Sequence, residues 1–138
     1  MSTPFHLEIL TPEHQFFSDD VEALTISTLD GEMTILKDHA PITAPLLVGS
    51  IKIKQNDEWR EAFQSEGFLE VTAEGAHLFV QACEWPENID VRRAEAAERR
   101  AREQLRQQRS MQEYRRFQIS LARAMVRLRI THTKINLD

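Results

Sequence analysis

The sequence predicts an α+β fold, in which an N-terminal antiparallel β-sandwich is followed by a C-terminal hairpin of two antiparallel helices. Short apolar segments separated by turn residues fill the first 85 residues, which is typical of a sandwich or barrel. After Pro86 there is no Gly or Pro, and apolar residues recur at helical spacing. The net charge changes from −12 over residues 1–88 to +7 over residues 89–138. We therefore predict two domains, residues 1–85 and residues 86–138.

Seven strands are expected in the first domain, each bounded by turn residues. The clearest is Ile51-Lys52-Ile53-Lys54, whose alternation of apolar and polar residues indicates a strand with one buried face. Turns are expected at Ser18-Asp19-Asp20 and at Leu29-Asp30-Gly31. The expected strands are Phe5–Ile9, Val21–Ser27, Glu32–Leu36, Val48–Lys54, Trp59–Phe63, Gly67–Thr72 and Ala76–Cys83.

A single cysteine, Cys83, excludes an internal disulfide, and its position in an apolar run predicts a buried, unreactive thiol. The chain opens with Met1-Ser2-Thr3-Pro4, which lacks the features of a secretory signal. No apolar run approaches the roughly 20 residues that a membrane-spanning helix needs. We therefore expect a soluble protein that reaches a membrane only through a partner.

Two helices are expected after the hinge Glu84-Trp85-Pro86-Glu87-Asn88. The first is capped by Asn88 or Asp90 and runs to about Gln108. The second begins at Met111 or Gln112 and ends at Ile130. The short connector Arg109-Ser110-Met111 favours an antiparallel hairpin. The apolar stripe of the first helix is Ala94, Ala97, Ala101 and Leu105, and that of the second is Phe117, Leu121, Ala124 and Leu128.

The hairpin is rich in arginine, with twelve arginines and one lysine in residues 89–138. A planar guanidinium binds phosphates and carboxylates bidentately, so this composition indicates an anionic partner. Asp90, Arg93 and Arg100 share one face of the first helix, and Arg116, Arg123 and Arg127 share one face of the second. If these faces meet, the crowded guanidiniums favour a bound polyphosphate or an acidic segment.

The ordinary alternative is a solvated arginine face that pairs with Glu95, Glu98 and Glu103. Arg92, Arg99 and Arg106 fit that description, because they lie on a different face of the helix.

Enzymatic motifs are absent from the sequence: there is no phosphate-binding glycine loop, no H-E-x-x-H and no paired cysteines. A non-catalytic protein is therefore expected. His39, in Lys37-Asp38-His39-Ala40-Pro41, lies in a loop, where a hydrogen bond within the loop and a partner contact are both open.

Three segments, in order, resemble the epsilon subunit of the bacterial F-type ATP synthase. They are the run from Asp30-Gly31-Glu32 to His39-Ala40-Pro41, then Ser65-Glu66-Gly67-Phe68-Leu69-Glu70-Val71, then Ile89-Asp90-Val91-Arg92-Arg93-Ala94. The resemblance covers essentially the whole chain. Thr34 and Lys37 depart from it, because the family commonly has Gly and Pro at these positions.

This resemblance implies a β-sandwich docked on the gamma subunit and on the membrane rotor ring of c subunits, with Glu32 and His39 facing the rotor. It also implies a mobile hairpin. Folded down, the hairpin lies against the sandwich. Extended, it runs along gamma, and its basic second helix, including Arg116, meets an acidic segment of a beta subunit and blocks ATP hydrolysis. The protein would then lie peripherally on the cytoplasmic side of the bacterial cell membrane.

Some members of the family bind ATP in the folded hairpin, and the resemblance extends to that site. Arginines would hold the phosphates and the nucleotide edge, Asp90 would orient an arginine or accept a sugar or base hydrogen bond, and Glu84 would accept from the adenine amino group. Mg²⁺ could accompany ATP, but the sequence shows no ligand cage for it. The implied ATP-binding residues are Glu84, Ile89, Asp90, Arg93, Ala94, Arg100, Arg123 and Arg127.

Two alternatives stay open beside the ATP sensor. The first is the same subunit without ATP binding, whose arginines contact only the acidic beta segment and the facing helix. The second is a nucleic-acid-binding hairpin. The acidic first domain, and a tail whose aromatic residues are Tyr114 and Phe117 alone, argue against nucleic acid.

Overall fold

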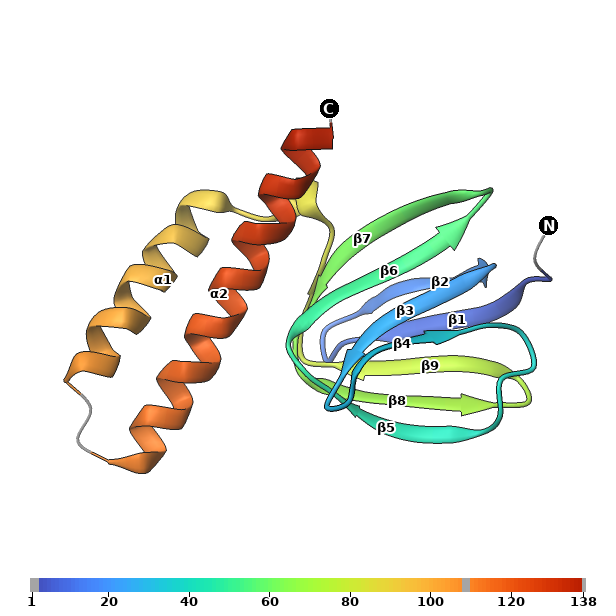
Figure 1. The fold of residues 1–138 in the computed structure, drawn as a ribbon, viewed down its shortest axis with the longest axis horizontal. Helices are drawn as coiled ribbons and strands as arrows, with labels where there is room; N and C mark the ends of the chain where they lie inside the picture. Colours follow the sequence, from blue (N-terminus) through green and yellow to red (C-terminus); the bar gives the residue numbers. More distant parts are fainter. Residues whose placement is uncertain (1–2, 108–109, 138) are drawn as a thin grey trace. The chain divides into compact units, whose positions relative to one another are not determined.

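The computed structural model describes the backbone of residues 3–107 and 110–137 and the side chains up to residue 132 (Figure 1). The chain divides into two compact units, Met1–Glu84 and Trp85–Asp138. This boundary lies one residue before the predicted one. Gln108 and Arg109, the expected helix end and connector, lie outside the described residues.

The first unit is built from ten strands within the described residues. They are β1 (Phe5–Leu10), β2 (Gln15–Val21), β3 (Ala23–Thr28), β4 (Gly31–Ile35), β5 (Ile42–Leu46), β6 (Gly49–Gln55), β7 (Glu58–Gln64), β8 (Gly67–Thr72), β9 (Gly75–Val80) and β10 (Cys83–Glu84). Hydrogen bonds join them in the order β10-β7-β6-β3-β5-β8-β9-β1-β2, and β4 pairs with β3. Figure 1 shows the strands curling over one another, as a sandwich requires. The predicted fold class is confirmed.

Alternation along the strands builds the core of this unit. In β6, Ile51 and Ile53 are fully buried while Lys52 and Lys54 keep their ammonium ends accessible, as the sequence predicts. The same two-residue alternation buries Leu7 and Ile9 of β1 in the core. Burying an aliphatic side chain of this size contributes about 1.5–3 kcal/mol, so the inward-facing positions of the strands supply most of the stability of the unit.

The sandwich is not wholly antiparallel, which corrects the prediction. β1 pairs with β9 in parallel, with Leu7 opposite Ala76 and Ile9 opposite Leu78. Parallel neighbours need a long connection, and here the connection is the rest of the domain between the first and ninth strands. Sequence alternation does not distinguish a parallel neighbour from an antiparallel one, because the side-chain period is the same.

Two strands, β2 and β5, were missed, and the predicted strand Ala76–Cys83 is divided into β9 and β10. Ser18-Asp19-Asp20, predicted as a turn, lies in β2, which pairs only with β1 along one edge of the sheet. Solvent on its other side allows polar residues there, and the side chain of Gln55 donates to the Asp20 carbonyl oxygen at 2.9 Å. The other missed strand is β5. Its Pro45 pairs with Phe68 of β8, and Pro lacks the N–H that a central strand normally uses.

The second unit contains a short 3₁₀ turn, η1 (Pro86–Asn88), and the helices α1 (Val91–Arg106) and α2 (Met111–Leu137). The two helices contact each other and run antiparallel, as predicted (Figure 1). α1 ends two residues before the predicted end. α2 continues past Ile130, because no Gly or Pro follows to stop it. No helix in the described part of the chain is long and apolar enough to cross a membrane.

Cys83, buried in β10, provides a test of this core. Burial, aided by the charge of Glu84, raises the pKa of its thiol from 9.0 to about 12. Since the thiolate is the reactive form and this pKa leaves little of it, we expect alkylation by iodoacetamide at pH 8.5 to be on the order of 1,000-fold slower than in denaturant. Folding raises this pKa, so the thiol's contribution to stability is complete below pH 9 and is lost as the pH rises toward 12. Equal labelling of native and denatured protein would contradict a buried thiol.

Candidate functional site

The start of α1 is fixed by Asp90, the acid of the motif Ile89-Asp90-Val91-Arg92-Arg93-Ala94. Its Oδ1 accepts a hydrogen bond from the backbone N–H of Arg93 at 3.0 Å, so Asp90 is the N-cap of the helix. This confirms one of the two caps that the sequence left open. The side chain predicted to orient an arginine or a nucleotide therefore already caps a helix, and the residue is exposed.

Arg93 and Arg100 lie on the exposed surface of α1. In the part of the chain that the structure describes, their guanidiniums take part in no hydrogen bond or ion pair. Two exposed guanidiniums, seven residues apart on one helix, lie two turns apart on the same face. They are available to an anion without breaking an existing contact.

Arg123 and Arg127 differ from this pair because both are half-buried on α2. Burial, and then the positive charge of Arg127 one turn away, lower the pKa of Arg123. Two like charges held this close in a partly desolvated place carry an electrostatic cost. A bound anion on this face of α2 would reduce that cost.

The apolar residues assigned to the nucleotide base have little free surface. Ile89 is 8% exposed and Ala94 is 5% exposed. Glu84 belongs to the other unit, where it ends β10 opposite Phe63 and is half-buried. The structure thus places the predicted arginines on both helices and makes Ile89 and Ala94 part of the packing of the second unit.

The remaining arginines of α1 include the ion pairs expected of a solvated face. Arg102 Nε lies 3.8 Å from Glu98 Oε1, and Arg106 Nη1 lies 3.6 Å from Glu103 Oε2. Such exposed pairs stabilise a helix by a few tenths of a kcal/mol. On α2, the guanidinium of Arg116 lies 4.9 Å from the centre of the Phe117 ring, which is a cation–π contact on an exposed face.

Glu32 and His39, predicted to face a rotor, lie at opposite ends of β4. Glu32 is the second residue of that strand and pairs with Lys52 at 3.6 Å. His39 follows the strand in a loop, where its Nδ1 lies 2.8 Å from the Ala40 carbonyl oxygen. The hydrogen bond within the loop is therefore present, and the partner contact stays a prediction. The two residues belong to different ends of the sandwich.

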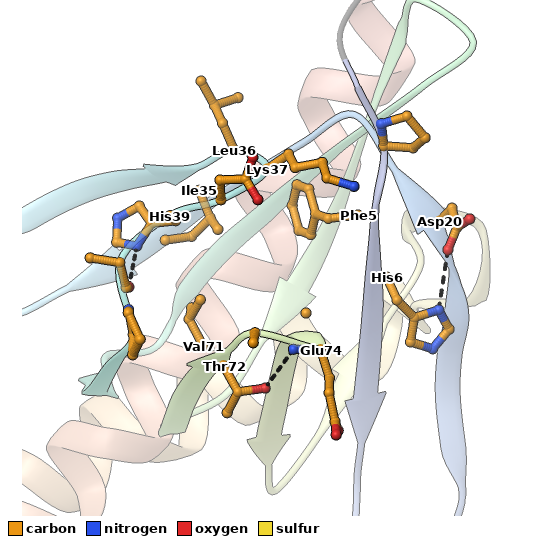
Figure 2. Close-up of a pocket in the computed structure, with 16 residues that line it drawn as sticks. Phe5, His6, Asp20, Ile35, Leu36, Lys37, His39, Val71, Thr72 and Glu74 are labelled. Carbon is orange, nitrogen blue, oxygen red and sulfur yellow. Dashed lines mark hydrogen bonds and ion pairs between the residues drawn. The ribbon is translucent and has the colours of Figure 1, made fainter.

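A cavity of about 500 Å³ opens at the His39 end of the sandwich (Figure 2). Apolar surface comes from Phe5, Ile35 and Val71, and the loop after β4 contributes Lys37. Figure 2 shows the pair of His6 and Asp20, 3.3 Å apart, to one side and the β8–β9 turn below. A volume in this range suits a small molecule or an inserted side chain of a partner.

Sequence reasoning missed this cavity because its walls come from segments far apart in the chain. It also missed the apolar opposite end, where Leu29 is 68% exposed and Leu47 is 44% exposed. The backbone N–H of Leu47 donates to the carbonyl oxygen of Ser27 at 3.1 Å, which places it beside the β3–β4 turn that carries Leu29. The available signal was a leucine inside the turn Leu29-Asp30-Gly31, although a single exposed apolar residue is common on protein surfaces and only its neighbour Leu47 makes it part of an apolar patch.

Comparison with known proteins covers both units. Residues 4–86 match the family model described as the β-sandwich domain of the ATP synthase delta/epsilon chain, and residues 87–131 match its long α-helix domain. An ATP synthase epsilon chain of Caldanaerobacter subterraneus subsp. tengcongensis is 47% identical over 131 residues, 94% of this chain and 95% of the relative. One of Caldicellulosiruptor bescii is 43% identical, over 91% of this chain and 92% of the relative.

Solved structures share the fold at lower identity. A chain of the Euglena gracilis mitochondrial ATP synthase, solved as an OSCP/F1/c-ring assembly, superposes with a TM-score of 0.77 at 20% identity and covers 98% of this chain and 82% of that chain. A chain of the Tetrahymena thermophila mitochondrial ATP synthase, solved as central stalk and c-ring, gives 0.64 at 13% identity, over 94% and 98% of the two chains.

The N-cap can be separated from any ligand role by two substitutions. We expect Asp90→Ala to destabilise the second unit by about 1 kcal/mol and Asp90→Asn by only a few tenths, because the amide oxygen of Asn still accepts from the Arg93 N–H. Urea denaturation followed by far-ultraviolet circular dichroism would measure both. Equal stability of the Ala variant and the wild type would exclude the cap as a stabilising contact.

Proposed function

The chain belongs to the epsilon chains of ATP synthase, and on that premise we propose that it is the regulatory, non-catalytic subunit of the central stalk. In this proposal the sandwich docks on the gamma subunit and on the c-subunit rotor ring. The helical hairpin inhibits ATP hydrolysis in an extended form and is held closed by ATP. The complex places the subunit peripherally on the cytoplasmic side of the bacterial membrane.

The observation that carries the ATP proposal is the half-buried pair of Arg123 and Arg127. Burial, and then the neighbouring charge of Arg127, lower the pKa of Arg123, so this guanidinium is partly desolvated beside a like charge. A triphosphate supplies several negative oxygens and matches guanidiniums through bidentate hydrogen bonds. Binding of ATP to this face would therefore place negative charge beside two half-buried guanidiniums.

Arg93 and Arg100 complete the proposed phosphate site from α1, where they are exposed. Asp90 caps the helix, and its remaining oxygen accepts a hydrogen bond from the sugar or base. Ile89 and Ala94 would provide apolar contact to the nucleotide base. Mg²⁺ would be bound by the phosphates and not by a set of protein ligands. The contact of Glu84 with the adenine amino group stays a prediction from the family resemblance.

A ligand that binds only one form of a two-state element shifts its equilibrium. ATP at a hundredfold excess over its Kd would stabilise the closed hairpin by about 2.7 kcal/mol. A shift of this size changes a balanced equilibrium roughly a hundredfold. Plentiful ATP then keeps the hairpin closed, and scarce ATP releases α2 to inhibit hydrolysis.

A second candidate function keeps the same subunit but removes ATP. Carboxylates pair with guanidiniums as phosphates do, so an acidic segment of a beta subunit would place negative charge beside the same guanidiniums. The exposed Arg116 of α2 favours this reading, because it lies outside the Arg123 and Arg127 pair. The two candidates differ in whether the isolated protein binds ATP.

Docking through the sandwich is supported by its two unlike ends. One end presents exposed Leu29 and Leu47 beside Glu32, and the other presents the cavity and His39. Exposed apolar residues at an interface core favour a protein partner. The solved assemblies with this fold are ATP synthases that include a c-ring. We propose that each end contacts a different component of the rotor.

Calorimetric titration of the full chain with ATP, with and without Mg²⁺, tests the sensor. We expect saturable one-to-one binding by the wild type and at least tenfold weaker binding by Arg93→Ala, since a hydrogen bond to a charged group contributes about 1.5–3 kcal/mol. Arg92→Ala is the matched control, because Arg92 is its exposed neighbour on another face of α1. Absence of binding by the wild type would establish the second candidate.

Removal of residues 89–138 tests whether the sandwich folds and binds the gamma subunit without the hairpin. The sandwich has its own core, so we expect residues 1–88 to fold and to bind the gamma subunit with unchanged affinity. Circular dichroism and a pull-down with purified gamma subunit would measure both properties. An unfolded fragment, or loss of gamma binding, would show that the hairpin is needed for docking.

A further inference from the structure

A side-chain contact between Arg102 and Met125 joins the two helices. Arg102 of α1 directs its Nη2 toward the thioether sulfur of Met125 on α2, at 4.0 Å. Each of these residues directly follows a fully buried alanine, Ala101 and Ala124. The contact therefore lies at the edge of the packed surface that holds the hairpin closed.

The guanidinium is oriented toward α2 by a second contact. Arg102 Nε lies 3.8 Å from Glu98 Oε1, one turn earlier on α1, while Nη2 faces Met125. The fork geometry of arginine fixes these two directions relative to each other. Met125 is 46% exposed, so the residue is accessible to a small oxidant while α1 and α2 stay packed.

We propose that Met125 is a site of reversible oxidation and that Arg102 binds the oxidised form. In the reaction the sulfur lone pair attacks one oxygen of a hydroperoxide, the S–O bond forms and the O–O bond breaks. The second oxygen leaves with a proton as water or an alcohol. Sulfur loses two electrons, the peroxide gains them, and methionine sulfoxide results.

Oxidation changes the strength of the contact because it changes the acceptor. A thioether sulfur is a weak acceptor, whereas a sulfoxide oxygen carries substantial negative charge and faces a cationic donor. The new oxygen stays at the exposed edge, so little desolvation opposes it. Sulfoxide formation in a core or apolar interface disrupts packing. At this exposed position it instead strengthens the interaction between Met125 of α2 and Arg102 of α1.

The direction of the effect follows from this geometry. Oxidised Met125 holds α2 to α1 more tightly, so the closed hairpin is more populated under peroxide. The chemistry and the stabilisation rest on the contact alone. Their consequence for the assembly, less inhibition of hydrolysis after oxidation, rests on the proposed function.

Hydrogen–deuterium exchange on the full chain tests the proposal. A Met111→Leu background removes the other strongly exposed methionine of the described residues, which is 67% exposed. After treatment with hydrogen peroxide, peptide mass spectrometry should find sulfoxide at Met125. Exchange in α1 and α2 should slow by about threefold, as expected for one net hydrogen bond at an exposed site.

Two further variants in the same background show whether the contact is responsible. Met125→Leu keeps the apolar volume but cannot be oxidised there, so peroxide should leave its exchange unchanged. Arg102→Gln should still form the sulfoxide but should show no slowing relative to its own unoxidised form. Treatment with methionine sulfoxide reductase should restore the original exchange rates.

Three results would overturn the proposal: faster exchange after oxidation, the same slowing in Arg102→Gln, or no sulfoxide at Met125 under conditions that oxidise free methionine. None of them depends on ATP. A failed ATP titration would leave this proposal intact, and a failure here would leave the nucleotide sensor intact.

Discussion

The parallel pairing of β1 with β9 is the constraint on which the sandwich depends. It joins the first strand of the chain to one nearly seventy residues later, and it places the fully buried Leu7 and Ile9 opposite Ala76 and Leu78. The strands approach closely, because Gly75, at φ 134°, has no Cβ to collide with the carbonyl oxygen of His6. Phe5 and the β8–β9 turn both line the cavity. A pairing of such long range also makes the domain slow to fold relative to a helical hairpin.

In the hairpin, close packing of the two helices partly buries positively charged arginines. Alanine at positions 94, 101 and 124 leaves room for close approach of the helices, and all three are buried. Arg123 and Arg127 then lie on a partly desolvated surface of α2, where burial and then the charge of Arg127 lower the pKa of Arg123. Phosphate and carboxylate both bind guanidiniums through the same bidentate geometry. In the proposed function this shared chemistry makes the nucleotide and the acidic segment alternatives for one surface, which is what a sensor requires.

Membership in the epsilon chains of ATP synthase gives these two units distinct tasks in the proposal. The sandwich presents an apolar end beside Glu32 and a hollow end beside His39, so it suits contacts with two different neighbours. Small buried alanines and the contact between Arg102 and Met125 hold α1 to α2, whereas the exposed ion pairs lie within α1, and each of these contacts is individually weak. Weak contacts keep the free-energy difference between two forms small, and modest binding energies then change the population of each form.

Local features of this protein followed from the sequence. The helical period, the alternation in β6 and the burial of Cys83 depend on neighbouring residues and were predicted correctly, and Asp90 was one of the two caps that the sequence left open. The family was also identified from three short motifs. Tertiary structure alone decided the rest. β2 is a strand because it hydrogen-bonds to β1 at the edge of the sheet. β5 is a strand because it pairs with β8, although it contains Pro45. The cavity and the burial of Ile89 arise where distant segments meet. Whether an arginine is exposed, like Arg93, or half-buried, like Arg123, depends on which face its helix turns inward. Periodicity is a property of a segment, whereas pairing and burial are properties of the whole chain, so only the folded molecule shows them.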